Sequence, residues 1–305
     1  MLLTTMQDNF SKLITEQRNP NSIDIDLKST EEIVRFFHEE DRNALAAVEA
    51  ESAAIVQGIT FITAAFQQEG RLFYVGAGTS GRLGVLDASE CPPTFGTEPG
   101  LVQGIIAGGE SALRGSVEAA EDQPVAGAKA ICDHGVSDRD VVVGIASSGR
   151  TPYVLGALEE AHRNGAKTIL LCCVPPDTHL KRFVDVFIAP VVGPEIVTGS
   201  TRLKAGTATK LVLNMLTTIS MIRTGKVYNN LMVDIQSSNV KMINRGIRII
   251  MEVARVDYDA ARAALERAGG SAKLAIVMLV KTIDRAEASA LLEKHNGFLR
   301  QALAE

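Results

Sequence analysis

The sequence predicts an α/β fold: a five-stranded parallel sheet flanked by helices, with a small C-terminal all-helical appendage. Five short, apolar, β-prone segments alternate with helical segments between residues 72 and 189. This alternation is typical of a parallel sheet with right-handed crossovers. Two of the segments run into similar turns rich in glycine and hydroxyl residues, and from residue 240 the pattern is only helical and alanine-rich.

Residues 1–40 are expected to form an N-terminal arm and a helix. The first part is polar and irregular, and Ser29 and Glu32 then have the spacing of a capping box, which predicts a helix start. A longer helix is predicted from about 41 to 69, with Gly70 in the usual C-cap position.

Residues 41–235 are expected to form the α/β domain, and residues 240–305 a C-terminal helical domain that serves packing or dimerisation. Strands are predicted over 72–75, 101–106, 141–145, 168–172 and 184–189. Helices are predicted from residue 80, within 111–133, over 152–164, briefly after the turn at 175–177, and up to residue 224. The C-terminal region shows no chemistry of its own.

Composition excludes several classes of partner. The chain has 305 residues and a formal net charge of −5, which argues against nucleic acid and against an anionic membrane surface. Its apolar runs are too short to span a bilayer, and its first residues lack the features of a signal peptide. The four cysteines show no CxxC pattern and the histidines are scattered, so we expect reduced thiols in a cytoplasmic protein with no metal site and no cofactor.

The first glycine-rich turn follows the strand predicted at 72–75. Gly76, Gly78 and Gly81 allow a tight turn and the close approach of a ligand to the backbone. Thr79 and Ser80 can cap the following helix, whose N-terminus suits a phosphate. The Gly-Lys-Ser/Thr of a P-loop is missing, as is the acidic residue of a dinucleotide site. A packed turn without any ligand remains the alternative.

A second stretch, residues 140–152, repeats this order. An apolar strand leads into Ser147, Ser148, Gly149 and Thr151, and Pro152 suits the first turn of a helix. Parallel sheets bind ligands at the carboxyl ends of their strands, where both turns would meet. Neutral hydroxyls and backbone amides suit recognition of a phosphomonoester on a sugar better than phosphoryl transfer.

Several carboxylates lie between the two turns. Glu90 precedes a double proline that fixes the backbone, although it could equally be a turn carboxylate bound to amides. Glu110 directly follows the second strand, which makes it the first candidate by position, but it could simply favour a helix N-terminus. Glu118, Glu121 and Asp122 form an acidic cluster that is consistent with a solvated helix face.

The two hydroxyl turns resemble the sugar isomerase (SIS) domain, a flavodoxin-like fold that binds phosphosugars. The resemblance extends over nearly the whole chain to the N-acetylmuramic acid 6-phosphate etherase family, which is related to a glucokinase regulatory protein. It rests on residues 76–96, 105–122, 141–154, 197–216, 225–234 and 297–303.

That resemblance implies a lyase that cleaves the D-lactyl ether of an amino sugar phosphate in cell-wall recycling. In the expected reaction the ring opens, a base removes the C2 proton, lactate leaves C3 and water adds back. By resemblance Glu90 is the acid and Glu121 the base. The phosphosugar-binding residues are expected to be Gly78, Thr79, Ser80, Ser147, Ser148, Gly149, Thr151, Glu110 and Lys204.

The position of Glu121 raises a geometric difficulty. A continuous helix from Ser111 would carry it roughly 15 Å from the strand end, at 1.5 Å per residue. Either the helix breaks near Gly115 and Ser116, with Ser116 capping a new turn, or a second subunit completes the pocket. We favour the break and also expect a homodimer.

Two other functions remain open. An aldose–ketose isomerase would use the same C2 base but no acid aimed at C3. A non-catalytic phosphosugar sensor would need the hydroxyl turns alone, and a DNA-binding regulator would add a basic helix-turn-helix that the N-terminus lacks. Glu90 and Glu121 together favour the enzyme.

Overall fold

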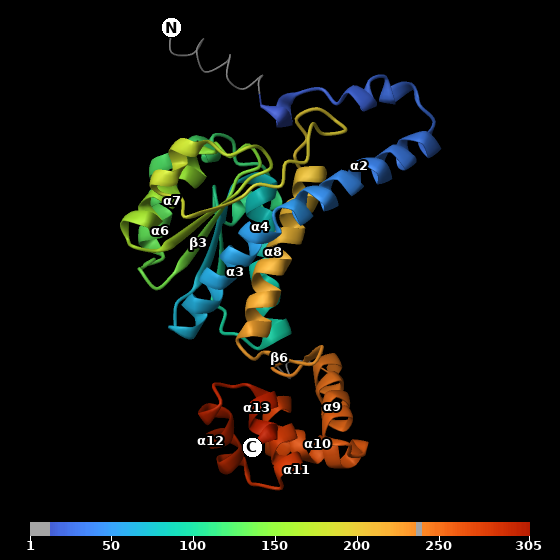
Figure 1. Ribbon diagram of the computed structural model, residues 1–305, viewed down its shortest axis with the longest axis vertical. Helices are drawn as coiled ribbons and strands as arrows, with labels where there is room; N and C mark the ends of the chain where they lie inside the picture. The colour runs from blue at the N-terminus through green and yellow to red at the C-terminus, as the bar shows by residue number, and fades with distance from the viewer. Residues whose placement is uncertain (1–12, 236–239) are drawn as a thin grey trace. The chain divides into compact units, whose positions relative to one another are not determined.

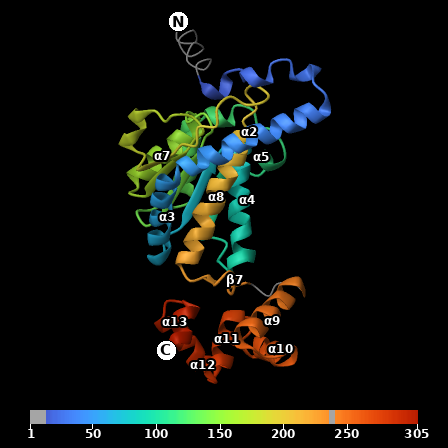
Figure 2. The ribbon, with the colours of Figure 1, turned by 45° about the vertical axis from the view of Figure 1, so that its right-hand side comes forward.

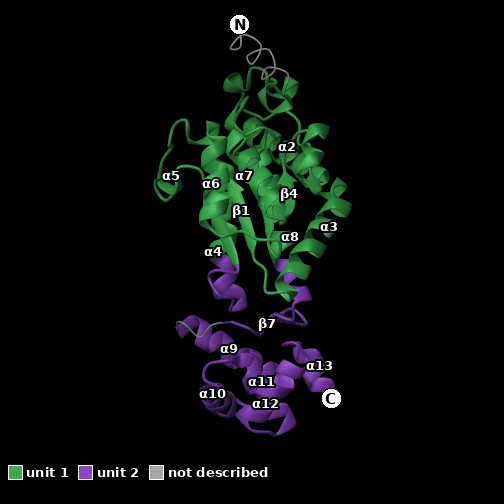
Figure 3. Ribbon diagram, turned by 90° about the vertical axis from the view of Figure 1, so that its left-hand side faces the viewer, with its two compact units in different colours: residues 1–89, 102–217 green, residues 90–101, 218–305 purple. Residues whose placement is uncertain are grey.

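The computed structural model describes residues 13–235 and 240–305. Residues 1–12 of the predicted arm lie outside these ranges. Contacts between residues divide the chain into two compact units, residues 1–89 with 102–217 and residues 90–101 with 218–305 (Figure 3).

A five-stranded parallel sheet forms the centre of the first unit, in the order β2-β1-β3-β4-β5. Its strands are β1 (Leu72–Gly76), β2 (Val102–Ile106), β3 (Val141–Ile145), β4 (Lys167–Leu171) and β5 (Val186–Ile188). This order is the flavodoxin-like one, so the predicted fold class is confirmed. The strand order reverses between β1 and β3, whose last residues, Gly76 and Ile145, are paired.

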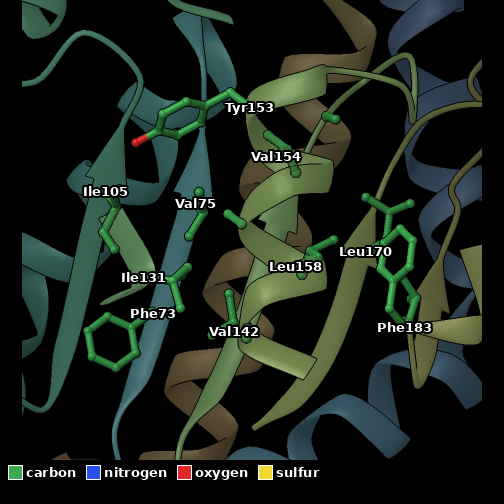
Figure 4. Packing of buried hydrophobic residues seen from close by; sticks show 14 of the residues in the cluster. Phe73, Val75, Ile105, Ile131, Val142, Tyr153, Val154, Leu158, Leu170 and Phe183 are labelled. Atoms are coloured by element: carbon green, nitrogen blue, oxygen red, sulfur yellow. The ribbon is translucent and has the colours of Figure 1, made fainter. Parts of the chain in front are cut away.

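Helices cover both faces of the sheet (Figures 1 and 2). One face carries α6 (Pro124–Asp133) and α7 (Pro152–Arg163), and the other carries α3 (Ser52–Gln67), α4 (Gly78–Phe95) and α8 (Lys204–Arg223). The core under α6 and α7 is made of aliphatic and aromatic side chains from strands and helices (Figure 4). Among them are Phe73, Val75, Ile131, Val142, Val154 and Leu158.

A buried carboxylate joins β1, α4 and α8 on the other face. Asp87 accepts hydrogen bonds from the Tyr74 hydroxyl (3.0 Å), the Asn214 amide (2.8 Å) and the Thr217 hydroxyl (3.0 Å). Burial raises the pKa of Asp87, although these three donors favour its charged form. This cluster fixes the two long helices to the strand that precedes the first hydroxyl turn.

The described N-terminal part, residues 13–50, contains three short 3₁₀ turns and a long helix. The turns are η1 (Ile14–Glu16), η2 (Pro20–Ser22) and η3 (Ile25–Leu27), and the helix is α2 (Thr30–Ala50). The predicted capping box of Ser29 and Glu32 is confirmed. The predicted boundary near residue 41 is wrong, because α2 runs on to Ala50 and breaks at Glu51, whose carboxylate accepts the backbone N–H of Ala189 (3.0 Å).

The segment between β2 and α6 breaks where the sequence predicts. The short helix α5 (Ser111–Arg114) ends at Gly115, and η4 (Ala120–Asp122) precedes α6. The Arg82 side chain of α4 stabilises the end of α5 by donating hydrogen bonds to the carbonyl oxygens of Leu113 (3.2 Å) and Gly115 (2.8 Å). No helical turn begins at Ser116, so that part of the prediction is wrong.

The second unit is mostly helical. Its elements are β6 (Val227–Tyr228), β7 (Leu231–Met232), α9 (Val240–Ala254), α10 (Tyr258–Arg267), α11 (Ala272–Lys281), α12 (Arg285–Lys294) and α13 (Leu299–Ala304). Buried Lys273 donates to the Asp234 carboxylate (2.6 Å) and to the carbonyl oxygens of Gly225 (3.0 Å) and Gly297 (2.9 Å). Burial lowers the pKa of Lys273. The ammonium thus joins three segments of this unit.

All four cysteines are free thiols, and three of them, Cys91, Cys172 and Cys173, are buried. Burial raises the pKa of Cys172 to about 11 and that of Cys173 to about 12. Within residues 13–235 and 240–305, no single helix is long and apolar enough to cross a membrane, whereas α2 and α3 pass that test only as a pair bent by 60°.

Candidate functional site

A cavity of about 590 Å³ lies in the first unit, beside the turns that follow β1 and β3. This is the point of strand-order reversal, where open α/β sheets bind ligands. The described residues that line it are Thr15, Glu16, Ala77, Gly78, Thr79, Ser80, Glu121, Asp122, Ser147, Ser148, Arg150, Thr151, Pro152, Gly199 and Thr201. Seven hydroxyl side chains and three carboxylates therefore face one space.

The turn after β1 is closed by contacts between backbones. A Cβ on Gly76 would lie 2.6 Å from the nitrogen of Gly81, and one on Gly81 would lie 2.6 Å from Cγ1 of Ile106. Gly78 has a positive φ of 54°. Gly76 and Gly81 thus pack α4 onto the sheet, and neither lines the cavity, although the sequence suggested that they let a ligand approach the backbone. Gly78, Thr79 and Ser80 do line it.

The turn after β3 is longer. Gly149 adopts a positive φ of 67°, and the Arg150 backbone N–H donates to the Ser148 hydroxyl (3.3 Å). Thr151 is the N-cap of α7 but its side chain makes no capping hydrogen bond, and the residue lines the cavity instead. Hydroxyls and the N-terminus of α7 therefore meet on this side, an arrangement that suits an anion.

Glu121 and Asp122 lie on η4 and both line the cavity. The break after α5 and the left-handed conformation of Ala119 (φ 57°) turn the chain back towards the strand ends. Both side chains are exposed, so either could exchange a proton with a bound molecule.

Glu90 does not line this cavity. It is exposed on α4, ten residues after Ser80, which corresponds to about 15 Å along a helix. The double proline, Pro92 and Pro93, lies within α4.

Three of the predicted binding residues are also absent from the wall of the cavity. Gly149 lines a neighbouring cavity of about 330 Å³, together with Ser148 and Arg150. Glu110 is exposed and occupies the N-cap position of α5. Lys204, the one predicted cation, is 1% exposed and forms a buried ion pair with Glu40.

The structure adds residues that the sequence interpretation did not select. Thr15 and Glu16 reach the cavity from η1, Gly199 and Thr201 from the segment before α8, and Arg150 from the second turn. Arg150, Gly199 and Thr201 lay in stretches on which the family resemblance rests, but none of them was selected as a site residue. No sequence pattern indicated Thr15 and Glu16, because contacts with residues distant in sequence hold this arm in place. Asn19 donates to the Glu40 carboxylate (2.9 Å) and to the Pro194 carbonyl oxygen (3.2 Å).

Two family models and a solved structure are similar to parts of this chain. The models of the glucokinase regulatory protein N-terminal SIS domain and of the SIS domain match residues 54–162 and 126–219. A solved phosphoheptose isomerase from Francisella tularensis superposes with a TM-score of 0.48 at 20% identity, covering 62% of this chain and 98% of that one.

Curated relatives match over nearly their whole length. An N-acetylmuramic acid 6-phosphate etherase of Salinibacter ruber is 52% identical, covering 98% of this chain and 96% of its own. The protein of the same name from Edwardsiella ictaluri is 51% identical, with coverages of 98% and 100%. That from Actinobacillus pleuropneumoniae serotype 7 is 54% identical, with 96% of each chain covered. This chain belongs to the N-acetylmuramic acid 6-phosphate etherase family.

Proposed function

We propose that this protein is a lyase that converts N-acetylmuramic acid 6-phosphate and water into N-acetylglucosamine 6-phosphate and D-lactate. The observation that carries this proposal is identity of 50% or more over nearly the full chain to proteins named for that etherase activity. The cavity supports it, because it combines hydroxyls suited to a phosphate with carboxylates suited to proton transfer.

The phosphate is held between the two turns. Thr79 and Ser80 lie in the first turn of α4, and Ser147, Ser148 and Thr151 precede α7. Their hydroxyls can donate to phosphate oxygens, and the N-termini of both helices favour negative charge. In this proposal the phosphate is bound without a cation, and Lys204 forms its ion pair with Glu40 instead.

Glu121 is the base in this proposal. In the ring-opened sugar the C2 proton is acidic because C2 adjoins the C1 aldehyde, so a carboxylate can remove it. The electron pair forms the C2–C3 double bond as the C3–O bond to lactate breaks. Water then adds back, placing a hydroxyl on C3 and a proton on C2. Positioned acid–base groups each contribute about 10²–10⁴-fold in rate.

The departing lactate oxygen needs a proton, and we assign this role to Glu90 of the partner subunit. In one chain Glu90 is exposed and does not line the cavity that contains Glu121. A homodimer in which α4 of one protomer approaches the cavity of the other would supply the missing acid. Free thiols at all four cysteines support a cytoplasmic location for this enzyme.

The direct test is release of D-lactate from N-acetylmuramic acid 6-phosphate. We expect turnover by the wild type, and in both Glu90→Gln and Glu121→Gln a loss of at least about 10²-fold. Glu118→Gln, a neighbouring acidic residue that does not line the cavity, should retain activity. Failure of the wild type to release lactate would overturn the proposal, and aldose–ketose interconversion instead would identify an isomerase.

Co-expression of the two inactive variants tests the shared site. A dimer that pairs Glu90→Gln with Glu121→Gln contains one site with both glutamates intact if each site uses two chains. Random pairing should then restore about a quarter of wild-type activity. If both residues act within one chain, every site lacks one of them and no activity returns, which would overturn the assignment of Glu90 to the partner.

A further inference from the structure

We propose that Arg150 binds the carboxylate of the lactyl group and thereby distinguishes the substrate from its product, N-acetylglucosamine 6-phosphate. This inference rests on the proposed function. The lactyl carboxylate is the one charged group that the substrate has and the product lacks, so a residue that binds it selects between them.

The charges around the cavity point to Arg150. Glu16, Glu121 and Asp122 are the acidic residues in its described lining, and Arg150 is the only basic one there. The substrate brings a phosphate and a carboxylate into this acidic surrounding. A bound carboxylate is costly without a compensating partner, and among the described residues that line the cavity Arg150 is the one cation placed to provide it.

Arg150 is also available. Its side chain has no hydrogen bond or ion pair to any residue within 13–235 or 240–305, and the residue is exposed. Its backbone is nevertheless fixed, because it follows Gly149 and its N–H donates to the Ser148 hydroxyl (3.3 Å). Lys204, by contrast, is buried against Glu40 and cannot turn to a ligand without leaving a buried carboxylate unpaired.

The carboxylate is a better partner for Arg150 than the phosphate. The phosphate already has five hydroxyls and two helix N-termini to bind it. The planar guanidinium matches a carboxylate in a bidentate arrangement.

The neighbouring cavity supports the same assignment. Arg150 and Ser148 line both cavities, and the second, of about 330 Å³, has apolar walls at Val174, Pro175 and Pro176. These side chains could accept the methyl group of the lactyl unit while its carboxylate stays on Arg150.

The test compares two ligands in three forms of the full-length protein: wild type, Arg150→Met, and Arg163→Met as control. Arg163→Met makes the same change of charge. Arg163 lies at the other end of α7 and lines neither cavity. For each form we would measure the KM for N-acetylmuramic acid 6-phosphate and the inhibition constant of N-acetylglucosamine 6-phosphate.

Arg150→Met should raise the KM about 10- to 100-fold, as expected for loss of a charge-assisted contact. The inhibition constant of the product should stay within about twofold, and Arg163→Met should change neither value by more than that. Arg150→Lys should recover part of the loss, because it keeps the charge without the bidentate geometry.

Two outcomes would overturn the inference. Equal weakening of both ligands would place Arg150 on the phosphate, and an unchanged KM would remove it from binding altogether. Titration calorimetry of both ligands needs no turnover. A wild type that binds the two sugars but releases no lactate would therefore count against the proposed function and leave the test of Arg150 intact.

Discussion

The two turns that border the cavity have similar sequences but different construction. The turn after β1 enters α4 almost at once, and the backbones of Gly76 and Gly81 touch. The turn after β3 is longer and open: around Gly149, an added Cβ would find its nearest atoms 3.5 Å away. The glycines of the first turn therefore set the position of a helix, whereas the second turn places Ser148 and Arg150 at the cavity.

This difference separates packing from recognition. A glycine that keeps two backbones in contact tolerates no side chain, while a glycine that only shapes a turn tolerates one at moderate cost. Replacing a glycine in the first turn should therefore cost more stability than replacing Gly149 in the second turn.

The largest effect is expected at Gly81. In Gly81→Ala the new Cβ would lie 2.6 Å from Ile106 Cγ1 and 2.8 Å from the Gly76 oxygen, so strand and helix must separate. We expect a loss of about 3 kcal/mol in the free energy of unfolding, measured by urea denaturation. Gly149→Ala, the matched change in the second turn, should cost only about 1 kcal/mol for its positive φ. Equal losses would contradict the comparison.

The second-largest loss of stability is expected at Asp140, which lies at the ends of β1 and β3 opposite to the two turns. Asp140, just before β3, accepts from the backbone N–H (2.8 Å) and guanidinium (2.8 Å) of Arg71, just before β1, and from the Ser137 N–H (2.8 Å). Asp140→Asn should cost about 2 kcal/mol, a value reduced because Arg71 is partly exposed.

The pH dependence of this loss is a further check. Burial alone would raise the pKa of Asp140, but the hydrogen bonds from Arg71 and Ser137 outweigh it and lower the pKa below the ordinary value of 3.8. The stabilisation is therefore complete above pH 3.8 and lost as the pH falls through the lower folded-state pKa. The difference between wild type and Asp140→Asn should be constant near neutral pH and shrink only in strong acid; a difference that changes near neutrality would contradict this account.

The smallest effects are expected for single hydroxyls. Ser80→Ala and Ser148→Ala should each raise the KM for the phosphosugar about tenfold, since each removes one hydrogen bond to a charged group. Ser89→Ala is the control, because that hydroxyl bonds the Leu86 carbonyl oxygen within α4 and does not line the cavity. An unchanged KM in Ser148→Ala would contradict the phosphate assignment.

Local patterns were sufficient to predict the sheet and much of the cavity. The strand at 141–145 has the predicted bounds, and the break after α5 follows from Gly115 and brings Glu121 to the strand ends. Alternating apolar segments and hydroxyl turns are properties of neighbouring residues, so the sequence shows them directly.

Contacts between distant residues could not be predicted in this way. Lys204 looked like a ligand for the substrate, but its partner Glu40 is 164 residues away and no spacing indicates the pair. The bond from Ala189 to Glu51 and the contact that holds Thr15 and Glu16 at the cavity are equally remote in sequence. Whether a charged side chain is engaged or available depends on such contacts.

The anchoring of Asn19 on Glu40 and Pro194 has a practical consequence for protein engineering. The regular secondary structure of the first unit starts at α2, so a designer who trims the chain to its regular elements would begin near residue 29. Such a shortened chain would keep its sheet and both hydroxyl turns but would lose Thr15 and Glu16 from the wall of the cavity and the hydrogen bond from Asn19 to Glu40. The shortest chain that holds every regular element of the first unit is therefore shorter than the one that keeps the whole wall of the cavity.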